Sequence, residues 1–141
     1  MEPLSADDLP DQALLLIDAA PIIYVLEAHH KFASRFEPLF QAHAAGRLSF
    51  AVTTVTITEV LTGPLKAGDE ALARRYRAIL ESWRVIALDA DIAESAARMR
   101  AALGFRLADA VQVASALAIN AAALVTHDRA FSRVSSLRII S

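Results

Sequence analysis

The stretch Leu14-Leu15-Leu16-Ile17-Asp18 joins four aliphatic residues to a carboxylate. An uninterrupted apolar run that follows a polar segment is typical of a central strand buried on both faces of a parallel sheet. Pro21 comes three residues after Asp18, and proline is favoured in the first turn of a helix. The stretch therefore predicts a buried strand, an acidic residue at its carboxyl end, and a helix that Ala20 caps.

Strand-like and helix-like patterns alternate along the rest of the chain. Further strands are expected at 48–53, 84–88, 123–126 and 137–140. After the helix that contains Pro21, further helices are expected at 32–45, 56–65, 69–83, 91–103 and 109–120. The Gly63-Pro64 pair is expected to close the helix at 56–65. Alternation of this kind predicts an α/β fold, in which a central parallel sheet of about five strands is flanked by helices.

The composition describes one folded domain, 1–141, with residues 1–12 as a flexible N-terminal tail. Hydrophobic residues make up 55% of the 141 residues and charged residues 21%, which excludes a disordered chain. The absence of cysteine excludes disulfides and thiolate metal sites. The acidic, proline-containing start lacks the pattern of a signal peptide, so a cytoplasmic location is expected.

The chain offers no clear membrane segment. Residues 110–127 carry no formal charge, but they contain four polar side chains and change from a helical to a strand-like pattern at Asn120. We interpret them as a buried helix followed by a buried strand. The net charge of −2 does not suggest nucleic-acid binding, although an acidic pocket would lower the net charge of a nuclease.

Four acidic residues are placed where they can meet. Asp18 and Asp128 follow predicted strands, Asp109 opens a predicted helix, and Glu59 is the only charged side chain among the apolar and hydroxyl residues around it. Ligands of open α/β sheets bind beyond the carboxyl ends of the strands. We therefore expect all four carboxylates in one crevice.

Clustered carboxylates repel one another unless a cation joins them, and oxygen ligands suit Mg²⁺ or Mn²⁺. Such an ion can generate hydroxide and stabilise a leaving oxygen, so no nucleophilic side chain is required. Each acid also has a purely structural interpretation. Asp18 and Asp128 could cap helical turns, Asp109 could complement a helix dipole, and Glu59 could be a solvated helix residue.

Four segments carry these acids in order: 15–23 (LLIDAAPII), 56–65 (TITEVLTGPL), 107–116 (LADAVQVASA) and 124–131 (LVTHDRAF). Together with the final strand at 137–140, they resemble the motifs of the PIN-domain family, and specifically its VapC-type toxin branch. In that likeness Asp18, Glu59, Asp109 and Asp128 match the family's acidic residues, and Thr126 matches a neighbouring hydroxyl. The likeness runs from about Leu14 to the C-terminus.

The resemblance implies a PIN-like three-layer sandwich. It implies a ribonuclease that depends on Mg²⁺ or Mn²⁺, cuts tRNA or other structured RNA, and forms a homodimer. A cognate antitoxin would bind and block the site. The sequence departs from the family at Ala19 and Ala20, where a hydroxyl or amide residue usually follows the first Asp. A contact that orients the carboxylate or a water is therefore expected to be missing.

Basic and aromatic residues flank the acidic motifs. Arg106, Arg129 and His127 are candidates for phosphate contacts, since guanidinium binds phosphate through two parallel hydrogen bonds. The alternatives are a solvated helix face for the arginines and an exposed strand-end position for His127. Tyr24, with Phe32 and Phe36, fits either a dimer or antitoxin surface or ordinary core packing.

Three other functions are weighed against the ribonuclease. A phosphatase with an aspartyl nucleophile requires Asp-x-Asp after the first strand, but position 20 is Ala. A two-component receiver requires a late Lys, and none occurs after Lys66. The third alternative is a PIN-like module that binds RNA or a partner with little or no turnover, which the Ala19-Ala20 departure keeps open.

Overall fold

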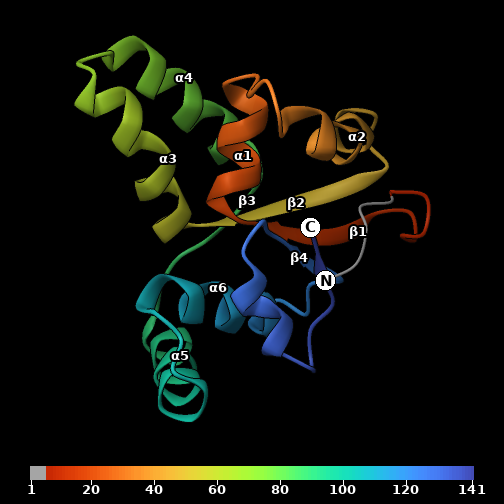
Figure 1. Cartoon of the computed structure of the whole chain (residues 1–141), viewed down its shortest axis with the longest axis vertical. Helices are drawn as coiled ribbons and strands as arrows, with labels where there is room; N and C mark the ends of the chain where they lie inside the picture. The colour runs from red at the N-terminus through yellow and green to blue at the C-terminus, as the bar shows by residue number, and fades with distance from the viewer. Residues whose placement is uncertain (1–5) are drawn as a thin grey trace.

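The computed structural model describes residues 6–141 (Figure 1). Its elements are, in order, β1 (Ala13–Ile17), α1 (Ala19–Leu26), α2 (Ala33–Ala44), β2 (Leu48–Thr53), α3 (Thr54–Lys66), α4 (Glu70–Glu81), β3 (Arg84–Ile86), α5 (Ala90–Leu103), α6 (Leu107–Ala118), β4 (Ala123–Val125), a 3-10 turn (Arg129–Arg133) and β5 (Ile139–Ile140).

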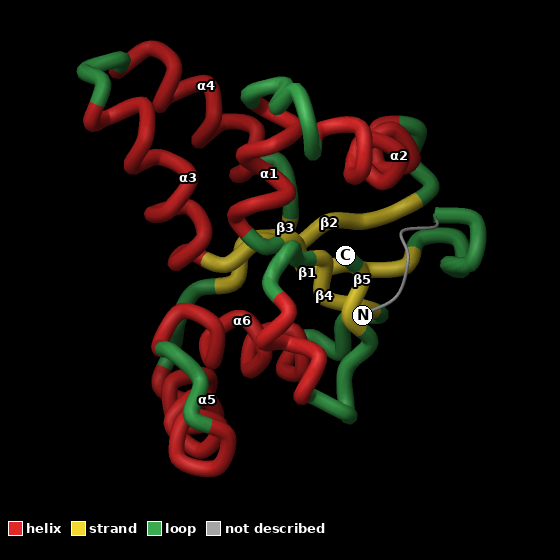
Figure 2. Tube along the Cα trace, in the orientation of Figure 1, coloured by secondary structure: helices red, strands yellow, loops and turns green. Residues whose placement is uncertain are grey.

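The strands form one parallel sheet in the order β3-β2-β1-β4-β5, with β1 at its centre (Figure 2). Helices α1 to α4 lie on one side of the sheet and α5 and α6 on the other, which gives three layers. The structure thus confirms the expected α/β sandwich. All carboxyl ends of the strands point to one edge, which we call the carboxyl edge, and the opposite edge is the amino edge.

The apolar run in β1 separates two hydrophobic cores. Successive side chains of a strand point to opposite faces. Leu15 and Ile17 therefore pack under α1 to α4, while Leu16 packs against α5 and α6, and none of the three is exposed to solvent. Burial on both faces explains why the run has no polar alternation.

Several helix boundaries lie one or two residues from the expected limits. Two of the differences, at α1 and α3, have a clear structural basis. Asp18, and not Ala20, caps α1: its backbone is extended and its Oδ1 accepts the N–H of Ala19 at 2.9 Å. Helix α3 also continues through Gly63 and Pro64 to Lys66. Proline inside a helix loses one backbone hydrogen bond, but Pro64 lies only two residues from the end of α3 and its ring is buried.

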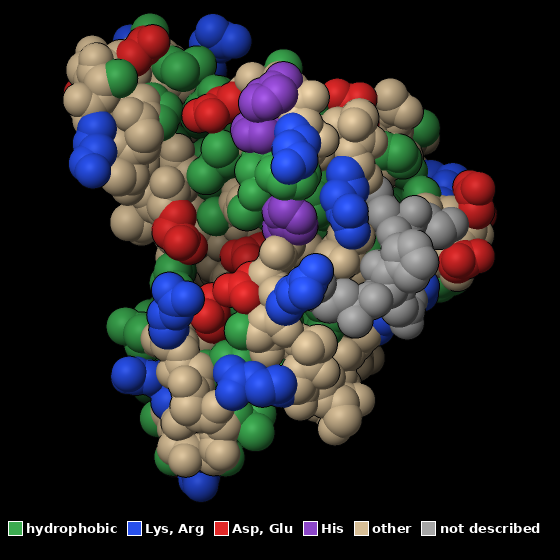
Figure 3. All heavy atoms as spheres, viewed as in Figure 1, with side chains coloured by type: hydrophobic (Ala, Val, Ile, Leu, Met, Phe, Trp, Pro, Cys, Tyr) green, Lys and Arg blue, Asp and Glu red, His purple; other side chains and the backbone are tan. Residues whose placement is uncertain are grey.

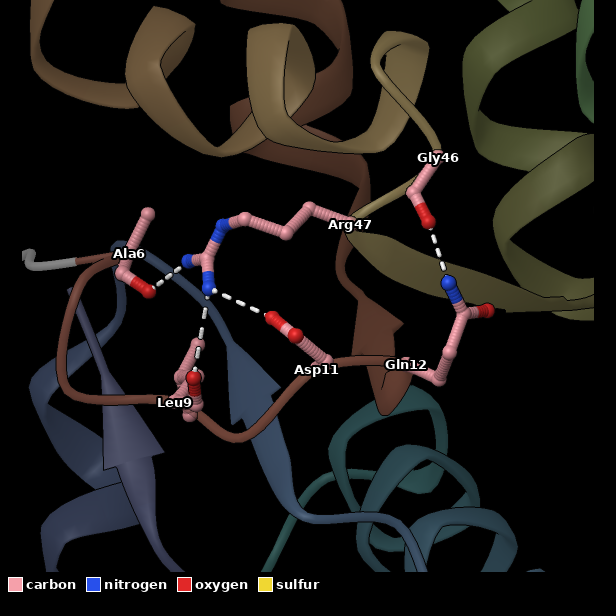
Figure 4. Close-up of polar contacts among 6 residues, drawn as sticks. All are labelled: Ala6, Leu9, Asp11, Gln12, Gly46 and Arg47. Atoms are coloured by element: carbon pink, nitrogen blue, oxygen red, sulfur yellow. Dashed lines mark hydrogen bonds and ion pairs between the residues drawn. The ribbon is translucent and has the colours of Figure 1, made fainter.

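Residues 6–12 of the expected tail make defined contacts with the amino edge; residues 1–5 lie outside the described residues (Figure 4). The Arg47 guanidinium donates to the carbonyls of Ala6 and Leu9 and to Asp11. Leu9 is buried, and the Gln12 amide donates to the Gly46 carbonyl. Arg47, which directly precedes β2, thus ties this segment to the start of that strand.

The uncharged stretch 110–127 is largely α6 followed by β4, as expected. Within residues 6–141, no helix has the length and apolar character needed to cross a membrane.

Candidate functional site

The four predicted carboxylates line one cleft of about 650 Å³ at the carboxyl edge. Asp18 leaves the end of β1, Glu59 projects from α3, Asp109 from the first turn of α6, and Asp128 follows β4. Figure 3 shows this group of acidic side chains on the face between the two helical layers. Arg106, His127 and Arg129 line the same cleft.

The Asp18 carboxylate is held by three hydrogen bonds. Besides the Ala19 N–H, Oδ1 accepts from the Gln112 amide at 2.9 Å, and Oδ2 accepts from the Thr126 hydroxyl at 2.8 Å. Gln112 and Thr126 are both buried. Ala19 and Ala20 offer no side-chain hydrogen bond, and the contacts that orient the Asp18 carboxylate come from Gln112 and Thr126 in other elements.

Gln112 is the centre of a buried polar network beneath the cleft. Its Nε2 also donates to the Thr56 hydroxyl at 2.8 Å, and its Oε1 accepts from the Thr53 hydroxyl at 2.7 Å. The network therefore joins the end of β2 and the start of α3 to Asp18. Sequence reasoning did not assign Gln112 to the site. The available signal was a lone amide in the apolar α6, one helical turn after Asp109 and so on the same face.

Asp128 both faces the cleft and stabilises the turn that follows it. Its Oδ1 accepts the N–H of Ala130 at 2.9 Å, and its own N–H donates to the Thr126 hydroxyl at 3.1 Å. Thr126 is thus shared between Asp18 and Asp128. The structural interpretations of Asp18 and Asp128 as helix caps are correct, and both side chains still line the cleft.

The cleft disfavours negative charge. Partial burial raises the pKa of Glu59, and the Asp18 and Asp109 carboxylates raise it further. Partial burial also raises the pKa of Asp109, together with Asp128 and Asp18, although Arg106 and Arg133 act in the opposite direction. No ion pair among residues 6–141 involves any of the four carboxylates.

His127 forms one wall of the cleft and is held by aromatic neighbours. Its Nδ1 lies 3.0 Å from the Tyr24 hydroxyl, and its ring meets Phe32 and Phe36 edge-on. Burial lowers the pKa of His127, and the Arg35 guanidinium lowers it further, which favours the neutral imidazole. His127 is therefore only partly exposed, in contrast to the exposed strand-end alternative.

The donor set fits a hydrated divalent ion. Within the described part of the chain, no three Asp, Glu or His side chains are close enough to enclose a single ion. Mg²⁺ keeps several of its waters and is usually bound through one or two carboxylates. An acidic cleft with oxygen ligands, and without a thiolate, suits Mg²⁺ or Mn²⁺ better than a caged Zn²⁺.

The fold and the cleft place the chain in the class of α/β proteins that carry an acidic site at the carboxyl edge of a parallel sheet. A comparison with protein families identifies the family within this class. The PIN domain model matches residues 15–137. The chain belongs to the PIN domain family. None of the curated proteins matches it.

Solved structures share the fold. A toxin–antitoxin complex from Klebsiella pneumoniae is 24% identical with a TM-score of 0.69, covering 90% of this chain and 96% of that chain. VapBC2 from Rickettsia felis, bound to a promoter DNA fragment, is 20% identical with a TM-score of 0.70, covering 89% and 96%. VapC20 of Mycobacterium tuberculosis, a toxin that cleaves the sarcin–ricin loop, is 16% identical with a TM-score of 0.69, covering 84% and 92%.

Proposed function

We propose that this chain is an endoribonuclease that depends on Mg²⁺ or Mn²⁺ and acts as the toxin of a toxin–antitoxin pair. The observation that carries the proposal is the convergence of four carboxylates on one cleft. Burial and the neighbouring carboxylates raise the pKa values of Glu59 and Asp109 there, and none of the four forms an ion pair within residues 6–141. A site of this kind favours a cation that neutralises the carboxylates.

Asp18, Glu59, Asp109 and Asp128 would hold the ion, directly or through its waters. When bound, the ion supplies a nucleophilic hydroxide and electrostatic stabilisation of the phosphodiester transition state. Gln112 and Thr126 fix the direction in which Asp18 presents its oxygens, since each donates to one of them. Thr126 also positions Asp128 through its backbone N–H.

Three side chains at the rim are suited to hold the RNA backbone. Arg106 and Arg129 are exposed and line the cleft, so their guanidinium groups can reach a phosphate beside the carboxylates. His127 would donate a hydrogen bond as a neutral imidazole. The two arginines offset the repulsion between the acidic cleft and the polyanionic substrate.

The proposed partners follow from family membership and shared fold. One structural neighbour is a toxin–antitoxin complex, and a second is VapBC2 bound to a DNA fragment. A third is described as a toxin that cleaves the sarcin–ricin loop. We propose tRNA or other structured RNA as the substrate, a cognate antitoxin as the inhibitor, a homodimer as the assembly, and the cytoplasm as the location.

The second candidate function is a PIN-like module that binds RNA or a partner with little turnover. Ala19 and Ala20 favour it, because they line the cleft without any polar side chain. The hydrogen bonds that Gln112 and Thr126 make to Asp18 weigh against it.

Cleavage of a mixed pool of tRNA and structured RNA separates the two functions. The purified chain, freed of any bound partner, is assayed with Mg²⁺, Mn²⁺ or EDTA beside Asp109→Asn. Cleavage that requires both the metal and Asp109 supports the ribonuclease. RNA binding by folded protein without cleavage under any condition supports the binding module, and full metal-dependent activity of Asp109→Asn contradicts the site assignment.

A further inference from the structure

A row of aromatic rings, which we call the ring row, runs outward from the cleft wall. It consists of His127, Tyr24, Phe32, His29 and His30. The centroid of His127 lies 5.4 Å from that of Tyr24 and 4.6 Å from that of Phe32. His29 lies 5.2 Å from Phe32, stacked on it, and 4.8 Å from His30, also stacked. The row therefore connects the acidic cleft to the exposed turn between α1 and α2.

The backbone of that turn fixes the rings in place. Ala28 has a φ of +50°, a left-handed conformation that a residue with a side chain rarely adopts. The turn lets the His29 N–H donate to the Tyr24 carbonyl at 2.8 Å. His29 Nδ1 in turn accepts the N–H groups of Lys31 and Phe32 at 3.1 and 3.2 Å. Strained backbone held by several hydrogen bonds is concentrated at binding and catalytic sites.

Two cations flank the ring row. The Lys31 ammonium lies 5.3 Å from the centre of the Phe32 ring. Arg35 donates to the Ser141 carbonyl at 3.0 Å, and both basic side chains are exposed. Figure 3 shows histidine side chains with Lys or Arg side chains beside them, on the same face as the acidic group. Rings and cations thus alternate beside a cleft that is itself acidic.

We propose that the ring row binds the single-stranded RNA that leaves the cleft on one side of the cleaved phosphate. Proteins bind single strands by stacking bases on aromatic side chains and by placing cations along the backbone. A base would stack on the exposed ring of His30 at the outer end of the row, which His29 and Phe32 support from behind, while Lys31 and Arg35 would contact phosphates. The inference rests on the proposed ribonuclease function and names the substrate segment that it engages.

Continuity with the cleft favours RNA over a protein partner as the occupant. A strand whose phosphate lies among the carboxylates must leave the cleft past one of its walls, and His127 and Tyr24 form such a wall. The rings beyond them are pre-ordered by backbone hydrogen bonds, so little entropy is lost when a base stacks there.

The test measures binding separately from cleavage. Each variant is placed in the Asp109→Asn chain, and its affinity for a short unstructured oligoribonucleotide is measured by fluorescence anisotropy over a range of salt concentrations. His30→Ala alters an exposed ring and is expected to weaken binding about tenfold. Lys31→Ala is expected to reduce the slope of log K against log salt by about 0.7. Arg74→Ala on α4 is the matched exposed control and should change neither.

A stacking readout excludes a purely electrostatic effect. An oligoribonucleotide with 2-aminopurine a few nucleotides away from the cleaved bond, where the strand would reach the outer end of the row, should lose fluorescence on binding, and His29→Ala or His30→Ala should restore it. If His30→Ala and Lys31→Ala both bind RNA as the parent does, the inference is overturned, and a loss of antitoxin binding instead would assign the row to a protein interface. If His30→Ala and Lys31→Ala weaken RNA binding but the chain with Asp109 intact does not cleave RNA, the ribonuclease function is overturned and the ring row is supported.

Discussion

The two edges of the parallel sheet differ in whether their carboxylates form ion pairs. At the amino edge, the Asp11 carboxylate lies 3.3 Å from Arg47, whose guanidinium also satisfies the carbonyls of Ala6 and Leu9 (Figure 4). At the carboxyl edge, four carboxylates share one cleft, and the ion pairs found among residues 6–141 involve none of them.

The difference separates a structural role from a binding role. Where a carboxylate has a cation at hand, its charge is neutralised and the contact ties two segments together. Where carboxylates repel one another and form no ion pair, the fold retains an unfavourable arrangement. Asp18 is nevertheless held by Gln112 and Thr126, which stabilise the geometry without neutralising the charge. The molecule thus orients Asp18 without pairing its charge, which is the arrangement we expect if a bound cation neutralises the cleft.

The largest effect is expected for Gln112→Leu. This change removes the donor to Asp18 and one of the hydrogen-bond partners of each of the buried Thr53 and Thr56 hydroxyls, which keep only the bond to each other between their side chains. We expect a loss of about 1–3 kcal/mol in the free energy of unfolding, measured in urea. RNA cleavage should fall by about 10- to 100-fold. Gln41→Leu, at an exposed position of α2, is the matched control. Unchanged cleavage by Gln112→Leu would show that Asp18 needs no orientation.

Thr126→Val should have a smaller effect of the same kind. Valine keeps the shape of threonine but removes the hydroxyl that links Asp18 to the Asp128 backbone. The free energy of unfolding should fall by about 1–2 kcal/mol. Turnover should fall by about tenfold. Thr62→Val, on the exposed face of α3, should change neither quantity.

Arg47→Met tests the amino edge. The variant loses the hydrogen bonds to Ala6, Leu9 and Asp11, and thermal or urea unfolding should show a loss of about 1 kcal/mol. Its cleavage rate per folded molecule should equal that of the parent. Arg98→Met, which breaks an exposed pair with Glu94, should cost less than about 0.5 kcal/mol. A drop in cleavage by folded Arg47→Met would contradict the separation of the two edges.

The smallest effect concerns Glu59→Gln in EDTA. The folded protein raises the pKa of Glu59 above its ordinary value of 4.5, so holding the charged form at neutral pH destabilises the fold. Glu59→Gln should therefore raise the free energy of unfolding, and with it the melting temperature, by less than about 1 kcal/mol because the side chain is only partly buried and solvent screens its charge. The gain should disappear as the pH falls through the raised pKa to below 4.5. Saturating Mg²⁺ should reverse it, since the parent then binds the ion.

Most of the fold could be predicted because its strands are short, apolar and bounded by turn or capping residues. The limits 48–53 predicted for β2 are those of the structure, since a glycine-containing turn precedes the strand and the Thr53 hydroxyl caps α3. The prediction that Gly63-Pro64 breaks the helix was wrong, since α3 runs to Lys66, one residue beyond the predicted range 56–65, with the Pro64 ring buried. Tertiary burial of that kind leaves no local signal in the sequence.

The acidic residues of the site could be predicted, but their supporting network could not. Asp18 and Asp128 follow strands, so the topology alone brings them to one edge. Gln112 contacts Thr53 and Asp18 over sequence separations of 59 and 94 residues, which local patterns do not reveal. The contacts that orient Asp18 despite Ala19 were hidden for the same reason, because they come from distant elements.

Mn²⁺ uptake by the folded chain tests the central claim most directly. Electron paramagnetic resonance of the free ion gives the bound fraction for the parent, Asp109→Asn and Arg47→Met. The parent and Arg47→Met should bind Mn²⁺ saturably with equal affinity, and Asp109→Asn should bind at least about tenfold more weakly. Absence of saturable binding by the parent, or equal binding by all three proteins, would contradict the claim that the carboxyl edge is a cation site.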